Sequence, residues 1–312
     1  MAKRARPTSK KKPSTAAAIF RSLRVHQWIK NGLVFVPLVL GGLIGEYDAW
    51  SYASLGFLAL SLAASASYIL NDIRDIESDR RHWSKRDRPF ASGALSIRTG
   101  YALAALLLIA AFGVAALIGP EEMVMLAIYV IAALSYTLYW KRIPVFDIFV
   151  LASLFTFRIA LGILILDVRI SPWLMIFSMF VFLSLSAAKR HTELLRNGIE
   201  EKQYLPGRGY LAGDAPLLLG LGLAAMLGAV LINIVYLLED AFPRAVYGNP
   251  VWLWSVPPVI FLFLGRIWLL SQRGLLLDDP VAFALEDRVS LSLALVGGLG
   301  FAAALIGLPT PS

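Results

Sequence analysis

The sequence predicts an all-α, polytopic membrane protein, a bundle of nine transmembrane helices with its N-terminus in the cytoplasm. Composition is the first reason, since 58% of the 312 residues are hydrophobic and only 16% are charged. A soluble domain would carry about 25% charged residues. The second reason is a series of nine apolar runs, each near the roughly 20 residues that cross a bilayer core as a helix. None of these runs alternates polar and apolar residues as a β-strand would.

Backbone amides and carbonyls inside a bilayer must be satisfied within the segment itself, which favours helices for all nine runs. Their expected limits are residues 28–46, 50–71, 99–118, 122–140, 145–166, 172–189, 215–238, 250–272 and 289–308. We expect residues 18–312 to form a single transmembrane domain. The Lys- and Arg-rich residues 1–17 are expected to form a disordered basic tail.

The basic residues set the expected orientation. With the N-terminus inside, the outer segments contain only Arg169 and Arg244 of the 29 Lys and Arg residues. Lys and Arg are concentrated in the cytoplasmic loops of membrane proteins. The inner segments are then residues 1–27, 72–98, 141–144, 190–214 and 273–288. We therefore expect a multi-pass protein of the inner (plasma) membrane, with its functional site facing the cytoplasm.

Several classes of function are excluded at this stage. The chain has no cysteine, so it has neither a disulfide framework nor a thiolate metal site. Most of the basic residues behind its net charge of +8 lie outside the apolar runs, which indicates membrane topology and anionic ligands instead of nucleic acid. The sequence contains no P-loop and no HExxH motif. The expected partners are the lipid bilayer and anionic substrates, and the sequence is compatible with a homo-oligomer.

The most informative segment is the acidic motif at residues 71–79. Asp72, Asp75 and Asp79 follow one another at spacings of 3 and 4, which places them on one face of a helix, with Glu77 pointing away. Converging carboxylates suit Mg²⁺, which commonly bridges one or two carboxylates to substrate phosphates. We expect these three aspartates to be the catalytic metal ligands. The basic residues that follow should bind phosphate oxygens; they are Arg81, Lys85, Arg86 and Arg88.

A second polar cluster ends the run at 172–189. Lys189 and Arg190 are placed to bind phosphates, with Glu193 one turn after Lys189 as a second metal ligand or an orienting group. The alternative is a helix C-terminus carrying cations that favour its dipole.

Other candidate ligands are scattered along the chain. Arg158 lies in the middle of the run at 145–166, where a charge should face a polar cavity or form an ion pair, for example with Asp147. Lys30 lies where the first run enters the bilayer. Tyr136 and Lys141 end the run at 122–140, either as substrate ligands or as interfacial anchors.

Four stretches resemble a known family. They are LRVHQWIKNGLVFVPL at 23–38, NDIRDIESDRRHWSKRDRPFASG at 71–93, SAAKRHTELL at 186–195 and DDPVAFALEDRVS at 278–290. Over roughly residues 18–308 the chain is similar to the UbiA-type intramembrane prenyltransferase superfamily. Within it, the chain most resembles the branch of decaprenyl-phosphate phosphoribosyltransferases, which serve arabinogalactan and cell wall biosynthesis.

The resemblance implies a UbiA-like helical bundle and a Mg²⁺-dependent glycosyl transfer. The donor would be 5-phosphoribosyl 1-diphosphate, the acceptor a polyprenyl (decaprenyl) phosphate, and diphosphate would leave. Asn71 would hydrogen-bond at the metal site, and Arg158 or Lys30 would hold the lipid phosphate.

The chain departs from the superfamily after residue 189. Aromatic prenyltransferases usually carry a second acidic motif there, DxxxD, whereas this chain has Lys189, Arg190 and the single carboxylate of Glu193. The extra positive charge suits a donor with an additional phosphate. Two alternatives stay open: an aromatic prenyltransferase that uses a polyprenyl diphosphate donor, and a transporter or channel. The latter does not explain aspartates at the inner surface instead of the bilayer midplane.

Overall fold

The computed structural model describes residues 14–81, 85–169, 171–196, 203–205, 207–243, 246–276 and 280–309, apart from the side chains of residues 282 and 285. Eight helices in these ranges are long and apolar enough to span a membrane. They are α3 (Tyr47–Arg74), α5 (Ile97–Ala116), α6 (Pro120–Leu138), α7 (Phe146–Ile165), α8 (Pro172–Arg196), α9 (Ala215–Tyr236), α10 (Val256–Gln272) and α12 (Arg288–Ile306). This confirms the predicted all-α membrane fold.

Shorter elements join or extend these helices. The short 3₁₀ segments among them are η2 (Trp140–Arg142), η3 (Ala212–Asp214) and η5 (Pro250–Ser255), and η4 (Leu237–Ala241) is a short π-helical segment. Two short α-helices, α4 (Ile76–Arg81) and α11 (Pro280–Glu286), flank membrane spans. Asp287 caps α12 by accepting from the Ser290 amide at 2.8 Å.

The first predicted span, 28–46, differs from the expectation of one continuous helix. The structure has α1 (Thr15–Leu23), a 3₁₀ segment η1 (Val25–Phe35) and α2 (Val36–Leu40). Side-chain bonds to α3 hold η1: Trp28 donates to Ser65 at 2.9 Å and Asn31 donates to Ser61 at 3.0 Å. Pro37, which has no amide hydrogen, lies in the first turn of α2. These polar contacts and the proline replace a single regular helix.

The start of α1 also corrects the predicted tail. The side chain of Ser14 accepts from the Ala17 amide at 3.3 Å, as an N-cap does. Residues 15–17 are therefore helical and do not belong to the disordered tail that was expected over 1–17. The rest of that predicted tail, residues 1–13, lies outside the described residues, as do His82 to Ser84 of the basic run and Asp278 and Asp279 of the fourth family-like stretch.

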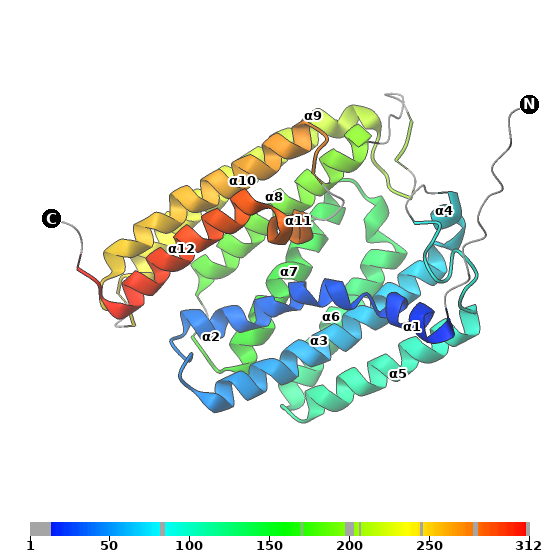
Figure 1. Cartoon of the computed structure of the whole chain (residues 1–312), viewed down its shortest axis with the longest axis horizontal. Coiled ribbons are helices and arrows are strands. Elements are labelled where there is room, and N and C mark those ends of the chain that lie inside the picture. The colour runs from blue at the N-terminus through cyan, green and yellow to red at the C-terminus, as the bar shows by residue number, and fades with distance from the viewer. Residues whose placement is uncertain are drawn as a thin grey trace, which may run out of the picture.

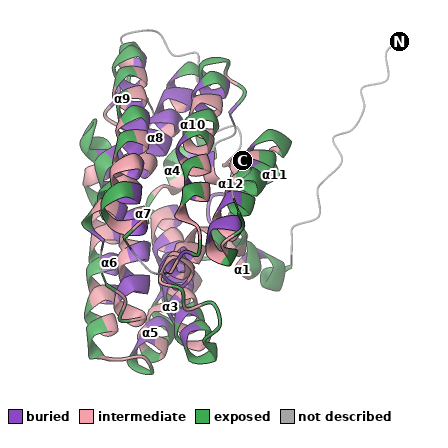
Figure 2. Ribbon diagram, turned by 90° about the vertical axis from the view of Figure 1, so that its left-hand side faces the viewer, coloured by how far each residue is buried: buried purple, intermediate pink, exposed green. Residues whose placement is uncertain are grey.

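The helices form two packed groups that meet at α7 (Figure 1). One apolar core joins α7, α8, α9, α10 and α12, and another joins η1, α2, α3, α5, α6 and α7. Close approach depends on small residues, as is usual for helices in membranes. At Gly162 of α7, an added Cβ would lie 2.2 Å from the Val34 carbonyl oxygen of η1. Exposed residues cover the outward faces of helices such as α5, α6 and α9 (Figure 2).

Candidate functional site

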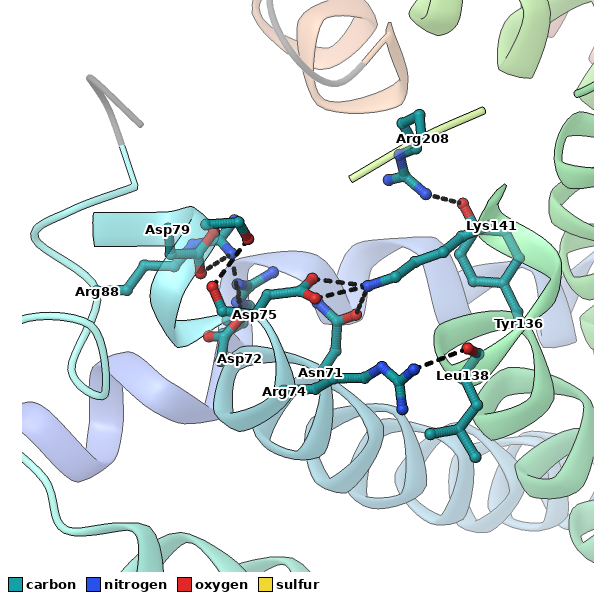
Figure 3. A network of polar contacts seen from close by, with 12 residues as sticks. Asn71, Asp72, Arg74, Asp75, Asp79, Arg88, Tyr136, Leu138, Lys141 and Arg208 are labelled. Atoms are coloured by element: carbon teal, nitrogen blue, oxygen red, sulfur yellow. Dashed lines mark hydrogen bonds and ion pairs between the residues drawn. The ribbon is translucent and has the colours of Figure 1, made fainter. Parts of the chain in front are cut away.

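The acidic motif lies where α3 ends, and the chain turns there. Asp75 follows the last residue of α3 with φ −94° and ψ 10°, and α4 begins at Ile76. The break separates the carboxylates that an unbroken helix would place on one face. Asp72 and Asp79 lie together, whereas Asp75 points to a different partner (Figure 3). We call this end of the bundle the aspartate end.

Asp72 and Asp79 share one guanidinium group. The Nη1 atom of Arg88 lies 3.1 Å from Asp72 Oδ1 and 2.7 Å from Asp79 Oδ2. Arg24 adds a contact of 2.5 Å from its Nη2 to Asp72 Oδ1. Both aspartates are almost fully buried, at 2% and 4% exposure. Two buried carboxylates repel each other, and cations between them offset that repulsion and their desolvation.

Asp75 is held by Lys141, which comes from the connection between α6 and α7. The Lys141 Nζ lies 2.8 Å from both carboxylate oxygens of Asp75 and 3.2 Å from Asn71 Oδ1 (Figure 3). Lys141 is only 4% exposed. Burial lowers the pKa of Lys141 below its usual value, and the hydrogen bond to Asp75 partly opposes that shift. The amine of Lys141 is thus held against the Asp75 carboxylate, within reach of an anionic ligand.

A solvent-connected cavity of about 250 Å³ lies beside Asp75 and Lys141. Its lining comes from three parts of the chain: the junction of α3 with α4, the α6–α7 connection and the segment 207–211. The lining residues are Arg74, Asp75, Glu77, Ser78, Arg81, Lys141, Arg142 and Gly207. Glu77 therefore faces the same cavity as Asp75, although the helical spacing predicted that it would point away.

The C-terminal part of α8 contributes a buried charge network. Arg190 and Asp147 are both fully buried, and Arg190 Nε lies 2.6 Å from Asp147 Oδ2. The same guanidinium donates to Glu193 Oε2 at 2.5 Å and to the Tyr136 hydroxyl at 2.8 Å. The charge of Glu193 is thus neutralised by Arg190, one turn earlier in the same helix. The predicted pairing of Asp147 with Arg158 is wrong, because Arg190 takes that carboxylate.

The segment 207–211 is anchored to this network. The Tyr210 hydroxyl donates to Asp147 Oδ1 at 2.5 Å and accepts from the Val145 amide at 2.8 Å. Burial and the neighbouring Asp147 raise the pKa of Tyr210, which keeps the hydroxyl protonated as a donor. Arg208 donates to the Tyr136 hydroxyl at 3.0 Å (Figure 3).

Arg158 lies deep in α7 and is 5% exposed. It donates to Asn31 Oδ1 at 2.8 Å, to the Tyr129 hydroxyl at 2.8 Å and to the Leu154 carbonyl. Its guanidinium also lies 5.1 Å from the centre of the Phe155 ring, and Lys30 Nζ lies 5.9 Å from the same ring. Within the described ranges no carboxylate pairs with Arg158. Hydrogen-bond acceptors and ring faces offset part of the cost of burying its charge.

The other predicted phosphate ligands differ in their surroundings. Lys85 is half-buried, and burial lowers its pKa while the nearby Glu193 opposes that shift. This places Lys85 near the end of α8. Lys189 is half-buried, whereas Arg81 and Arg86 are exposed. The structure thus gathers most of the predicted residues at the aspartate end, with Arg158 and Lys30 apart from them.

The oxygen-bearing side chains at the aspartate end match the chemistry of Mg²⁺ binding. Carboxylate and amide oxygens are the protein ligands that this hard cation prefers. In the described part of the chain, no three acidic, histidine or cysteine side chains form a ready-made ion site. The bridge made by Arg88 nevertheless shows that Asp72 and Asp79 can share one positive charge. The donor atoms are therefore of the type that suits the ion, while in this structure Arg88 and Lys141 occupy the positions beside them.

Sequence reasoning missed several residues of these networks. Arg24, Arg208 and Tyr210 belong to no acidic or basic motif of regular spacing, and only folding brings them to the aspartate end. Asn31 carried a weak signal, since a polar residue within an apolar run is costly unless it has a partner. Its partners are Ser61 and Arg158.

Comparison with known proteins places this geometry in a family. The sequence profile of the UbiA prenyltransferase family matches residues 34–285. A Sinorhizobium fredii protein, described as uncharacterized protein y4nM, is 41% identical over 268 residues, covering 86% of this chain and 52% of the relative. This chain thus spans about half the length of that relative.

Two further relatives are matched over most of their length. Nodulation protein NoeC of Azorhizobium caulinodans is 32% identical over 282 residues, covering 89% of this chain and 90% of the relative. Decaprenyl-phosphate phosphoribosyltransferase of Mycobacterium tuberculosis is 31% identical over 297 residues, covering 92% and 95%.

The fold has solved counterparts. The structure of a UbiA homolog from Archaeoglobus fulgidus, bound to DMAPP and Mg²⁺, is similar with a TM-score of 0.69 and 15% identity, covering 93% of this chain and 99% of that one. At this identity the likeness concerns the fold. Together with the eight apolar helices, the family match shows that this chain is a multi-pass membrane enzyme of the UbiA prenyltransferase family.

Proposed function

We propose that the protein transfers 5-phosphoribose from 5-phosphoribosyl 1-diphosphate to a polyprenyl phosphate, such as decaprenyl phosphate, and releases diphosphate. The reaction would take place at the aspartate end, on the cytoplasmic face of the inner membrane, within one transmembrane domain of residues 18–312. The product would be a polyprenyl-phosphoryl-5-phosphoribose.

The observation that carries this proposal is the pairing of the single carboxylate at the inner end of α8. Glu193 is bound by Arg190, and Lys189 and Arg208 also act on it electrostatically. A second Mg²⁺ would need a second pair of aspartates at this end of α8. The helix supplies cations there instead. An excess of cationic groups favours a donor that carries a phosphate in addition to its diphosphate.

The relatives support the same reading to different degrees. The Mycobacterium tuberculosis protein carries the name decaprenyl-phosphate phosphoribosyltransferase and aligns with 92% of this chain. The Sinorhizobium fredii relative is more similar, at 41% identity, but its name assigns no substrate. The proposed substrates therefore rest on the charge pattern and on the names of less similar relatives.

Asp72, Asp75 and Asp79 are the residues that would hold Mg²⁺, with Asn71 beside them. When bound, the ion would neutralise the diphosphate and favour its departure. Arg88 and Lys141 now neutralise the same aspartates and would turn to the diphosphate oxygens as the substrate binds. The acceptor phosphate is largely ionised near neutral pH and attacks the anomeric carbon without a strong general base. Catalysis then rests on positioning and charge stabilisation.

The lipid phosphate needs a cation closer to the bilayer core. Arg158 makes three polar contacts with its five N–H groups and has no carboxylate partner among the described residues. Lys30 lies near the same Phe155 ring as Arg158, with its Nζ 5.9 Å from the ring centre. We assign these two residues to the acceptor phosphate, whose prenyl tail would leave between apolar helices.

A transfer assay tests the function. Purified protein in detergent with Mg²⁺ receives radiolabelled phosphoribosyl diphosphate and decaprenyl phosphate. Label should enter the organic phase; EDTA should abolish the transfer, and Asp75→Asn should lower it strongly to a residual rate. The exposed Arg98 at the start of α5 provides a control, Arg98→Gln, that should keep wild-type activity.

A second candidate is an aromatic prenyltransferase with a prenyl diphosphate donor; DMAPP, which the solved homolog binds with Mg²⁺, is a prenyl diphosphate. A parallel reaction therefore contains a prenyl diphosphate and 4-hydroxybenzoate. Prenylated aromatic product in that reaction, with no labelled lipid in the first, would replace the phosphoribosyl proposal.

A further inference from the structure

The cavity beside Asp75 has an unusual lining. All eight lining residues are charged or polar or glycine, and none carries an apolar side chain. Its volume of about 250 Å³ exceeds by far the roughly 10–15 Å³ that one water molecule needs. The cavity is thus large enough for a phosphorylated sugar fragment but offers nothing to a prenyl chain.

The charges of the lining have a positive excess. Four cations, Arg74, Arg81, Lys141 and Arg142, face two carboxylates, those of Asp75 and Glu77. The excess of two positive charges matches a phosphate monoester, which carries about −1.5 to −2 near neutral pH. Arginine is also suited to bind phosphate oxygens in pairs.

The walls are held in place by backbone contacts. At Gly209, an added Cβ would lie 2.1 Å from the carbonyl oxygen of Arg142, so the segment 207–211 packs directly on the α6–α7 connection. Arg74 donates to the Leu138 carbonyl at 3.0 Å, at the end of α6 (Figure 3). The cations therefore come from elements that are fixed to one another.

We propose that this cavity binds the 5-phosphate of the phosphoribosyl donor, with Arg81 and Arg142 as its phosphate ligands. The inference rests on the proposed function and extends it. Asp75 and Lys141 form the wall that the cavity shares with the aspartates. A donor whose 5-phosphate lies in the cavity can thus direct its diphosphate toward Asp72 and Asp79. The acceptor lipid also carries a phosphate monoester, but the cavity offers no apolar surface to its prenyl tail, which favours the donor as the occupant.

Inhibition by fragments of the donor tests this subsite. In the transfer assay, ribose 5-phosphate reports on the 5-phosphate subsite and inorganic diphosphate reports on the aspartates. Arg81→Gln and Arg142→Gln should each raise the inhibition constant of ribose 5-phosphate, and the KM of the donor, by about tenfold, because each removes a charge-assisted bond. The inhibition constant of diphosphate and the KM of decaprenyl phosphate should stay within about twofold, which also shows that the variants are folded. Arg98→Gln should change none of these values.

The outcomes separate the inference from the function. If wild-type protein labels the lipid but neither variant weakens ribose 5-phosphate, the subsite is refuted while the proposed function stands. A rise in the KM of decaprenyl phosphate, with the donor unaffected, would instead assign the cavity to the lipid phosphate and refute the inference. If wild-type protein transfers no phosphoribosyl group, both fall together.

Discussion

Lys141 offers the sharpest test of the aspartate site, through Lys141→Met. This change keeps much of the apolar stem and removes the ammonium that contacts both oxygens of Asp75 and Asn71 Oδ1. A hydrogen bond to a charged group contributes about 1.5–3 kcal/mol. Three such contacts do not add, because Asp75 is 24% exposed and water can replace part of them. We therefore expect Lys141→Met to lower the stabilisation of the transition state by about the free energy of one such bond, about 1.5–3 kcal/mol.

That loss corresponds to a decrease of about 10- to 150-fold in kcat/KM for the donor. The measurement is the initial rate of labelled lipid formation at low donor concentration. Asp75→Asn and the double variant Lys141→Met/Asp75→Asn complete a cycle. If Lys141 acts through Asp75, the double variant should be no slower than Asp75→Asn alone.

The competing interpretation of Lys141 is an interfacial anchor. An anchor would leave kcat/KM within about twofold of wild type and would lower only thermal stability. That result, in a protein that still binds donor normally, would refute the assignment of Lys141 to the site. Arg98→Gln, on the exposed start of α5, controls for the loss of one positive charge.

Three further outcomes are expected. Burial lowers the pKa of Lys141 below its usual 10.5. Between the lowered pKa and 10.5 the unfolded chain holds a proton that the folded chain has released. Stability contributed by this group therefore rises with pH while kcat/KM falls, and Lys141→Arg should remove that alkaline fall because arginine stays charged. Arg190→Met should lower the free energy of unfolding by about 3–5 kcal/mol, measured by thermal unfolding, because it leaves Asp147 buried without its cation. The double variant Arg190→Met/Asp147→Asn should recover part of that stability, and no recovery would argue against an Arg190–Asp147 ion pair. Gly209→Ala should lower the free energy of unfolding by about 1–3 kcal/mol, because the added Cβ would lie 2.1 Å from the Arg142 carbonyl oxygen. The control Gly113→Ala, whose Cβ would have nothing within 4 Å, should not destabilise the protein. Equal unfolding midpoints for the two variants would refute the packing of Gly209 on Arg142.

The sequence predicted the membrane fold well because its signal is local. Long apolar runs must be helical in a bilayer, and eight of the nine predicted spans are long helices. The exception is the span at 28–46, whose geometry depends on side-chain contacts with another helix, and these cannot be read from the hydropathy of the span itself. Asn31 and Trp28 bond to serines on α3 that lie 30 and 37 residues further along the chain, and these bonds accompany the 3₁₀ geometry of η1.

The sequence also determined which residues gather at the aspartate end. The acidic motif and the cations after it follow the second apolar run, and the basic end of α8 follows the sixth. Both runs are even-numbered, so they end on the same side of the membrane. Family membership follows from the same stretches and is confirmed by the match over residues 34–285.

Only the tertiary structure decided which charge meets which. The break at Asp75 turns the motif, so that Arg88 joins Asp72 to Asp79 while Lys141 takes Asp75. Asp147 pairs with Arg190 instead of Arg158, and Tyr210 reaches Asp147 from a distant segment. Helical spacing fixes where a side chain lies on its own helix. Partners on other helices depend on backbone turns and packing distances, which no local pattern of residues encodes.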